Sequence, residues 1–400
     1  MRTNQSVEPS LGWTYLSRKA LTRAKAQMDE ESTGVRDEVG FLTIHQRYAD
    51  RFFPGTSVLH ARVRYALFVP WLFEDLAGET GPKVARMLRE RERMLAGRLK
   101  EAKEEKVIGG NVYPKPSSQP PSTVYWNALG VWGILRPRAD GRSISRAQAH
   151  LLLKGASKAT DDDGQPLVFS ESPFILLPKR PKGWLDGKID LRLSTAEARF
   201  LRARFTSLRR SGSSELSLLA RLVRTEAAAP HAMWADQVLD IAASDRTPLR
   251  RAQCAAALAA VGRAVYDALL EDMIERVDKR SISRRHRDHL VDVVAKEGHV
   301  AMQVRRDALE ADIGVLPDKL GRVIEKTRNW VDSGAADFRD LFDVYVAAEA
   351  RKKLRARLAP TANARQRRLE WARDEHTLAA PLHYRWGQVK TMLDDLANAR

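Results

Sequence analysis

Cysteine is nearly absent from this sequence, whose 400 residues include one, Cys254. One thiol leaves no partner for an internal disulfide and cannot complete a structural zinc site, which excludes zinc-finger and dithiol redox classes. Long apolar runs are absent too, because stretches such as 65–73 fall far short of the roughly 20 residues that cross a bilayer. No apolar signal core lies near the first residue. We therefore expect a cytoplasmic protein with no membrane partner.

The familiar motifs of catalysis and cofactor binding are also missing. The chain has no phosphate-binding loop ending in Gly-Lys-Ser/Thr, no Gly-x-Gly-x-x-Gly, no Gly-x-Ser-x-Gly and no His-Glu-x-x-His. His286, His289 and Asp292 are spaced three apart, which would place them on one face of a helix as metal ligands. Arginines at 284, 285 and 287 surround them and disfavour a cation. We expect neither a cofactor nor a metal.

Positive charge is what the chain has in excess. It contains 68 Lys and Arg against 51 Asp and Glu, which gives a formal net charge of +17. Such a surplus is typical of a protein with a polyanionic partner, so nucleic acid, and DNA in particular, is the expected partner. The alternative is that arginine is abundant only because the organism's proteins are rich in Ala and Arg, since net charge concerns association and not fold.

Three stretches concentrate this charge. The strongest, 351–368, has no acid and eight basic residues: Arg351, Lys352, Lys353, Arg355, Arg357, Arg365, Arg367 and Arg368. A second stretch, 279–287, includes Arg284, Arg285 and Arg287, and a third spans 199–210. Phosphates neutralised by such side chains release counterions, so the stretches predict DNA affinity that falls with salt. The alternative is three solvated helix faces that point in different directions.

Helical periodicity runs through most of the chain, which predicts a mainly α, multi-domain protein. The one extended-looking part predicts a small β insertion near 165–193. An amphipathic helix is expected over 16–30. After Ser194, which forms a Ser-x-x-Glu capping box with Glu197, the predicted helices are 195–210, 214–225, 231–243, 248–275, 282–297, 301–313, 317–332, 336–357, 362–374 and 382–398.

Changes in composition suggest where domains begin and end. The segment 109–121 has four prolines and two glycines, which is typical of a linker or extended loop. The predicted division is an N-terminal helical domain over 1–108, the linker over 109–121, a winged-helix-like domain over 122–193 and a C-terminal basic helical domain over 194–400.

The first of two candidate helix-turn-helix pairs covers 44–77. Pro54-Gly55 should break the first helix, and Ser57 should cap a second one. The second helix of such a unit contacts DNA with its N-terminal residues, which here include Ser57, His60 and Arg64. We expect Arg64 to contact phosphate. Arg62 would point elsewhere on the helix and is the expected buried partner of an acid, with these candidates: Asp37, Glu38 and Asp50.

The second candidate pair covers 122–153 and offers Arg142 and Arg146 as contacts to DNA, beside a short β-wing over 133–145. Any two amphipathic helices joined by a short turn share this pattern, so packing in a core is the alternative for both pairs.

Two other functions stay open. A nucleic-acid-processing enzyme, either a nuclease or a DNA glycosylase, would use dispersed acids; its first candidates are Asp50 beside Arg51 and Glu38 near His45. A protein-binding adaptor would dock a helicase or nuclease, with the charge serving only for solvation. Whether the protein is an enzyme is left undecided, and binding without catalysis is favoured.

Several blocks of this sequence resemble a bacterial protein family of unknown function. They are Asp-Glu-Val-Gly at 37–40, Phe-Pro-Gly-Thr-Ser at 53–57, Arg-Val-Arg-Tyr at 62–65 and Val-Pro-Trp at 69–71, with weaker similarity at 121–135 and 195–201. The resemblance spans about residues 10–270.

Members of that family occur in genomic islands devoted to antiphage defence. The resemblance implies a recognition or scaffolding component of such a system, with helicase or nuclease subunits as partners. Within these blocks, Phe53 and Trp71 are expected in the core and Gly55 at a special backbone angle.

Overall fold

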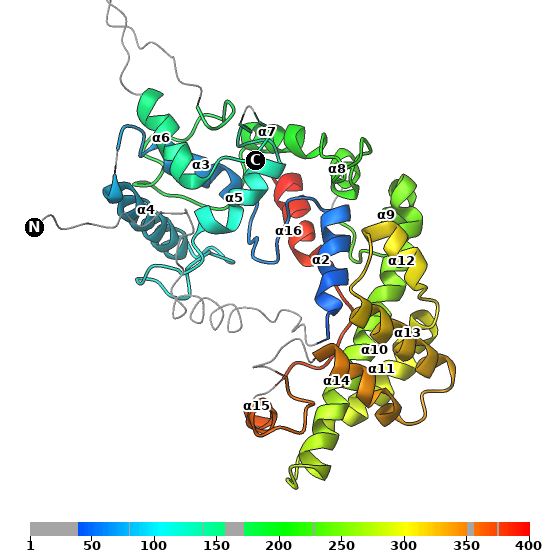
Figure 1. Cartoon of the computed structure of the whole chain (residues 1–400). Helices are drawn as coiled ribbons and strands as arrows, with labels where there is room; N and C mark the ends of the chain where they lie inside the picture. The colour runs from blue at the N-terminus through cyan, green and yellow to red at the C-terminus, as the bar shows by residue number, and fades with distance from the viewer. Residues whose placement is uncertain are drawn as a thin grey trace, which may run out of the picture. The chain divides into compact units, whose positions relative to one another are not determined.

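Helices account for nearly all the regular structure of this chain (Figure 1). The computed structural model describes residues 39–79, 81–138, 140–156, 172–226, 229–349, 356–373 and 376–400. In these ranges the protein has fifteen α-helices and no β-sheet, which confirms the predicted mainly α class. Arg36–Arg400 forms one compact unit. The helix predicted over 16–30 lies outside the described residues.

The first five helices precede the capping box at Ser194: α2 (Phe41–Phe52), α3 (Tyr65–Glu74), α4 (Pro82–Glu101), α5 (Pro121–Val131) and α6 (Arg146–Ala156). The ten helices predicted after Ser194 are all present, most with shifted ends: α7 (Thr195–Phe205), α8 (Leu218–Arg224), α9 (Asp236–Ile241), α10 (Arg246–Arg276), α11 (Arg285–Ala301), α12 (Arg306–Ile313), α13 (Asp318–Asp332), α14 (Phe342–Glu349), α15 (Ala362–Arg373) and α16 (Trp386–Ala397). The predicted capping box is present, because Ser194 and Glu197 exchange side-chain to backbone hydrogen bonds at the start of α7.

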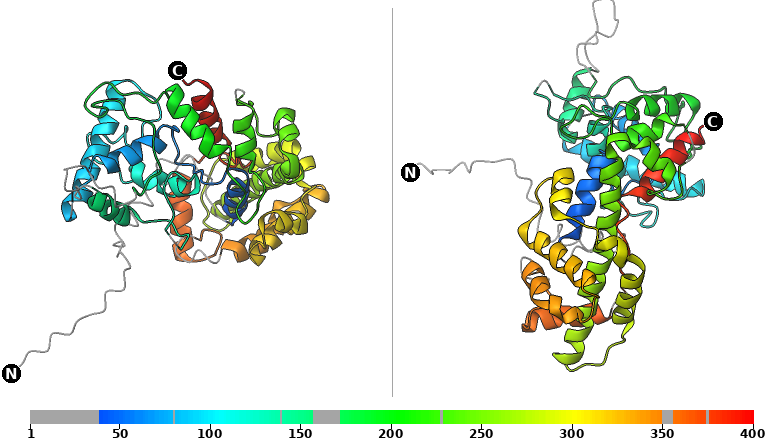
Figure 2. Two further views of the ribbon diagram at one scale, coloured as in Figure 1. Left: turned by 90° about the horizontal axis from the view of Figure 1, so that it is seen from above. Right: turned by 90° about the vertical axis from the view of Figure 1, so that its right-hand side faces the viewer.

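The long helix α10 is the core of the second half of the chain. It contacts α2, α11, α12, α13 and α15, and the right-hand view of Figure 2 shows α2 beside it. The run 255–260 is alanine-rich and buried, and small side chains allow neighbouring helices to approach closely. By length and composition alone, Ala243–Arg276 could cross a bilayer, and 78% of its apolar window is buried inside the protein.

The first predicted helical pair is only partly correct, because α3 begins at Tyr65 and not at Ser57. Residues 53–64 form a loop that is held by α16: the Asp395 carboxylate accepts from Arg62 Nε at 2.8 Å and from the Val63 N–H at 2.9 Å. These tertiary bonds replace the helical bonds that the apolar spacing favoured. Pro70 lies inside α3, which continues to Glu74.

The expectations for Phe53, Trp71 and Gly55 are confirmed, whereas Ser57 caps no helix, because α3 begins at Tyr65. Phe53 and Trp71 are fully buried. Gly55 has a φ of +78°, and a Cβ built on it would lie 2.6 Å from the indole nitrogen of Trp132. A side chain is therefore excluded by both backbone angle and space.

The predicted β insertion is wrong for the part that the structure describes. Residues 172–193 contain no strand, and Phe174 forms one isolated bridge with Leu135. Prolines at 173, 178 and 181 remove backbone donors that a sheet would need. A second isolated bridge, Pro137 to Ser143, closes a short hairpin within the predicted wing.

Candidate nucleic-acid interface

Two of the predicted basic clusters meet where α15 docks against the turn between α10 and α11 (Figure 1). Arg368 of α15 has a side chain only 1% exposed, and its guanidinium forms a two-pronged ion pair with Asp278 of that turn. Nε and Nη2 each lie 2.7 Å from a carboxylate oxygen. Nη1 donates to the carbonyl oxygen of Ala359 at 3.0 Å and also to that of Arg357. A bidentate, fully hydrogen-bonded pair of this kind fixes both distance and orientation.

An aromatic contact fixes the same junction. The ring of Trp371 on α15 lies 5.1 Å from that of His286 at the start of α11. Burial and the nearby Arg285 lower the pKa of His286 to about 4, so this ring is neutral at pH 7. The start of α11 is capped from α10, because the buried Glu271 carboxylate accepts the N–H groups of His286 and Arg287 at 2.9 and 3.0 Å. Burial raises the pKa of Glu271.

Five cationic side chains remain exposed around this junction. We name them the α10–α15 basic surface: Lys279, Arg280, Arg284, Arg285 and Arg365. Arg284 and Arg365 are 70% and 58% exposed. The nearest carboxylates compensate part of this charge. Asp278 forms its close pair with Arg368 and also lies 3.8 Å from Arg365 Nε, and the Arg284–Asp288 pair is 4.0 Å long and solvated.

Other predicted members of the clusters form hydrogen bonds or ion pairs with carboxylates of the protein, some buried and some at the surface. Arg287 is 10% exposed and pairs with Glu271 and Glu275 at 3.3 and 2.7 Å. Arg367 pairs with Glu370, and the backbone N–H of Arg357 donates to Glu349. Arg368, expected to contact phosphate, is instead a buried structural residue. Four more predicted contacts lie outside the described residues: Arg351, Lys352, Lys353 and Arg355.

The contacts predicted in the first helical pair are not on a helix and are largely enclosed. His60 stacks on Tyr125 with ring centroids 4.3 Å apart, and burial lowers its pKa to about 4. Arg64 is buried and pairs with Glu197 and Asp190, while Ser57 accepts the Leu59 N–H within the loop. Arg62 does pair with an acid, but that acid is Asp395, which was not among its expected partners. Arg64, expected to contact phosphate, is the more buried of the two arginines.

The second pair keeps its predicted contacts at the surface. Arg142 lies in the turn of the short hairpin, and Arg146 begins α6; both are exposed. Arg146 donates to the hydroxyl of Thr123 at 2.8 Å, which joins the start of α6 to α5.

The residues suggested for catalysis do not converge. Asp50 is 62% exposed and pairs with Arg385 at 2.6 Å, whereas His45 is fully buried. Burial lowers the pKa of His45 to about 3, and neither ring nitrogen has a hydrogen-bond partner within the described ranges. Glu38 lies outside them. Across the part of the chain that the structure describes, no three His, Cys, Asp or Glu residues are grouped as metal ligands.

Sequence reasoning missed the two residues that hold α15 against the turn between α10 and α11. Asp278 is a lone acid at the end of α10, and Trp371 is a lone aromatic residue in a basic helix. The local pattern did not reveal a buried partner for either residue, because both partners are distant in the sequence. Asp278 and Arg368, for example, are 90 residues apart.

Comparisons with known proteins place the chain in a family. No curated protein and no solved structure matches it. The sequence model of a family matches residues 10–400, which extends well past the resemblance seen over 10–270. The chain therefore belongs to the family of unknown function DUF6361.

Proposed function

We propose that this protein binds nucleic acid, with DNA as the first ligand, through the α10–α15 basic surface. The observation that supports this is the buried Arg368–Asp278 pair, which holds two basic stretches from distant parts of the sequence at one junction. Because Arg368 forms the close pair with Asp278, most of the exposed cations beside it are available for phosphate groups; Arg365 also lies 3.8 Å from that carboxylate. Sequence-independent contacts of this type supply most of the affinity of non-specific DNA binding.

Arg142 and Arg146 would serve as a second contact region. They are exposed at a hairpin and at the first turn of α6, and arginines at such places can enter a DNA groove. This second region is proposed separately from the α10–α15 basic surface. Substitutions at Arg142 and Arg146 would test it without changing that surface.

The biological setting that we propose rests on the sequence resemblance. Similarity to proteins of defence islands suggests a cytoplasmic recognition or scaffolding component of an antiphage system, working with helicase or nuclease subunits. Phage plaque counts on cells that carry the system with and without this chain would test that setting.

Fluorescence anisotropy with a labelled DNA duplex tests the binding proposal on the full chain. The triple variant Arg280→Gln, Arg284→Gln and Arg285→Gln should weaken binding at least about tenfold in low salt. Each phosphate contact contributes about 0.9 to the slope of log affinity against log salt, so loss of three contacts should flatten the slope by about 2 to 3.

A matched control removes the same charge elsewhere. Lys83, Arg86 and Lys100 are exposed on α4, and their triple change to Gln should leave both affinity and salt slope nearly unchanged. Equal losses in the two triple variants would show that only net charge matters and would contradict a defined interface. Release of nicked DNA or free base in the same mixtures would instead favour the enzyme alternative.

A further inference from the structure

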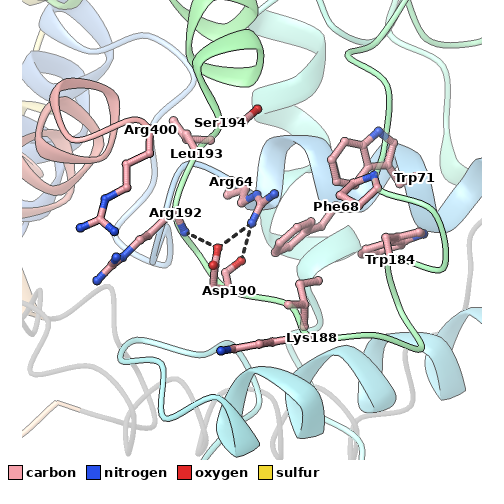
Figure 3. A pocket seen from close by; sticks show the side chains of 12 residues that line it. Arg64, Phe68, Trp71, Trp184, Lys188, Asp190, Arg192, Leu193, Ser194 and Arg400 are labelled. Carbon is pink, nitrogen blue, oxygen red and sulfur yellow. Dashed lines mark hydrogen bonds and ion pairs between the residues drawn. The ribbon is translucent and has the colours of Figure 1, made fainter.

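A pocket of about 350 Å³ lies between α3, the segment 181–194 and the last residue, Arg400 (Figure 3). Small-molecule sites typically have volumes of roughly 300–1,000 Å³. Backbone hydrogen bonds hold its wall together: the Arg400 N–H donates to the Leu193 carbonyl at 3.0 Å, and the Thr195 N–H donates to the Arg400 carbonyl at 2.8 Å. The pocket is therefore built from three segments that are far apart in the sequence.

One side of the pocket is aromatic (Figure 3). The ring of Trp184 lies 5.6 Å from that of Phe68 and 5.5 Å from that of Trp71. The Trp184 indole N–H donates to the Asp75 carboxylate at 3.0 Å, which fixes the orientation of the ring. These buried rings make an apolar floor against which a flat group can pack.

The opposite side is cationic. Lys188, Arg192 and Arg400 are exposed there, with Arg192 and Arg400 drawn on the far side of Arg64 from the aromatic rings (Figure 3). Among the described residues, no carboxylate lies within ion-pair distance of these three side chains. Within the ranges that the structure describes, the one side-chain carboxylate that lines the pocket is that of Asp190.

Arg64 lies between the two sides. Its guanidinium pairs with Asp190 at 2.8 Å and with Glu197 at 2.9 Å, and its central carbon is 5.3 Å from the centre of the Phe68 ring. The Nε–H of this side chain, which is 10% exposed, has no acceptor among the described residues. Buried donors without acceptors are uncommon, and an unfilled ligand site is one physical reason for them.

We propose that this pocket binds a nucleoside phosphate. The phosphate would lie among Lys188, Arg192 and Arg400, and the planar base would pack toward Phe68 and Trp184. A free nucleotide and the terminal nucleotide of a strand share this chemistry. A neighbouring hollow of about 500 Å³ shares Arg192 and Arg400 with the pocket, but Glu105, Asp394 and Asp395 also line it, which favours a free nucleotide over a longer strand. The proposal goes beyond binding at the α10–α15 basic surface and does not depend on it.

Isothermal titration calorimetry on the full chain tests the proposal. AMP, GMP, CMP and UMP are titrated beside adenosine and inorganic phosphate, and at least one nucleotide should bind at least about tenfold more tightly than adenosine or phosphate. The double variant Lys188→Gln and Arg192→Gln should weaken that binding at least about tenfold. Arg199→Gln, an exposed arginine on α7 that does not line the pocket, should change it less than about twofold.

Short oligonucleotides distinguish the two possible ligands, a free nucleotide and the terminal nucleotide of a strand. A 5′-phosphorylated strand that binds more tightly than both the tightest of the four nucleotides and its own 5′-hydroxyl counterpart assigns the pocket to strand ends, and preference for the free nucleotide assigns it to free nucleotide. The proposal is overturned if no nucleotide binds at millimolar concentration, if phosphate alone binds as tightly as the tightest nucleotide, or if the double variant, with an unchanged unfolding midpoint, binds like the parent chain.

Discussion

At the scale of single residues, arginines of one basic cluster can be either exposed to solvent or buried in an ion pair. Arg365 and Arg368 are three positions apart on α15, yet the first is 58% exposed and the second is 1% exposed. Both arginines lie near the buried carboxylate of Asp278, but Arg368 forms the two-pronged pair with it at 2.7 Å, whereas Arg365 Nε stays 3.8 Å away with its side chain in solvent. A basic stretch in a sequence therefore overstates the charge that the surface presents.

Arg368→Met should destabilise the protein strongly. The change leaves Asp278 buried without its partner, and breaking a buried ion pair on one side is typically destabilising by about 3–5 kcal/mol. Urea unfolding of the full chain measures this. Arg367→Met removes a solvated pair with Glu370 and should change the free energy of unfolding by less than about 1 kcal/mol. Similar effects for the two substitutions would contradict the structural role of Arg368.

The buried His45 should make stability depend on pH. Burial, together with His383 and Arg385 nearby, lowers its pKa from 6.5 to about 3. The unfolded chain takes up a proton below pH 6.5 and the folded chain does not, so stability present above pH 6.5 is lost as the pH falls toward 3. Removing this titration with His45→Phe should reduce the slope of unfolding free energy by about 1.4 kcal/mol per pH unit between pH 6 and 4.

The control for that measurement is His299→Gln, because His299 is exposed on α11. Denaturant unfolding at several pH values should give the parent slope for this variant. An unchanged slope in His45→Phe would show that His45 is protonated in the folded protein.

At the scale of elements, the packing between helices decides which side chains fit at each position of a helix. Gly262 of α10 faces the ring of Phe41 on α2 and the hydroxyl of Tyr345 on α14. A Cβ at this position would lie 2.4 Å from Phe41 Cζ, so the three helices can approach only because a side chain is missing.

Gly262→Ala should therefore destabilise the protein by about 1–3 kcal/mol, even though alanine is the better helix former. Gly387→Ala on α16 is the matched control, because nothing lies within 4 Å of its Cβ position. That change should be neutral or stabilising by up to about 1 kcal/mol. Thermal unfolding of both variants measures the difference, and the same sign in both would contradict the packing argument.

The sequence predicted the positions of helices better than the tertiary contacts that individual residues make. All ten helices after Ser194 were correct because periodicity and caps are local signals. The start of α3 was wrong because Asp395, more than 300 residues away in sequence, holds the preceding loop. The basic clusters were found, but which arginines are buried depended on carboxylates such as Asp278 that local patterns do not reveal. The pocket beside Arg64 was not predicted, because the cations that line it are isolated in the sequence.

At the scale of the whole molecule, the helices of Arg36–Arg400 are extensively connected. The segment that contains α2 and α3 contacts α10 and α12 on one hand and α4, α5 and α6 on the other. Helix α16 contacts α7 and α8 and also holds the loop before α3. The division into domains at 109–121 and 194 stays a prediction.

These connections lead us to expect one cooperative unfolding transition for Arg36–Arg400. Differential scanning calorimetry and tryptophan fluorescence should report the same midpoint, since α2 and α16 cannot separate from either set of partners without exposing core. Two resolved transitions, with a stable fragment beginning near 122 or 194 after limited proteolysis, would support the predicted domains instead.

The anchoring of Arg400 has a practical consequence. Two backbone hydrogen bonds hold this residue against 193–195, so any peptide or dye fused after it is tethered at the mouth of a cavity. A fluorophore attached there would act as a reporter of occupancy, whereas a bulky purification tag would crowd incoming molecules. A tag on protein made for titration should accordingly be placed away from Arg400 or removed before the measurement.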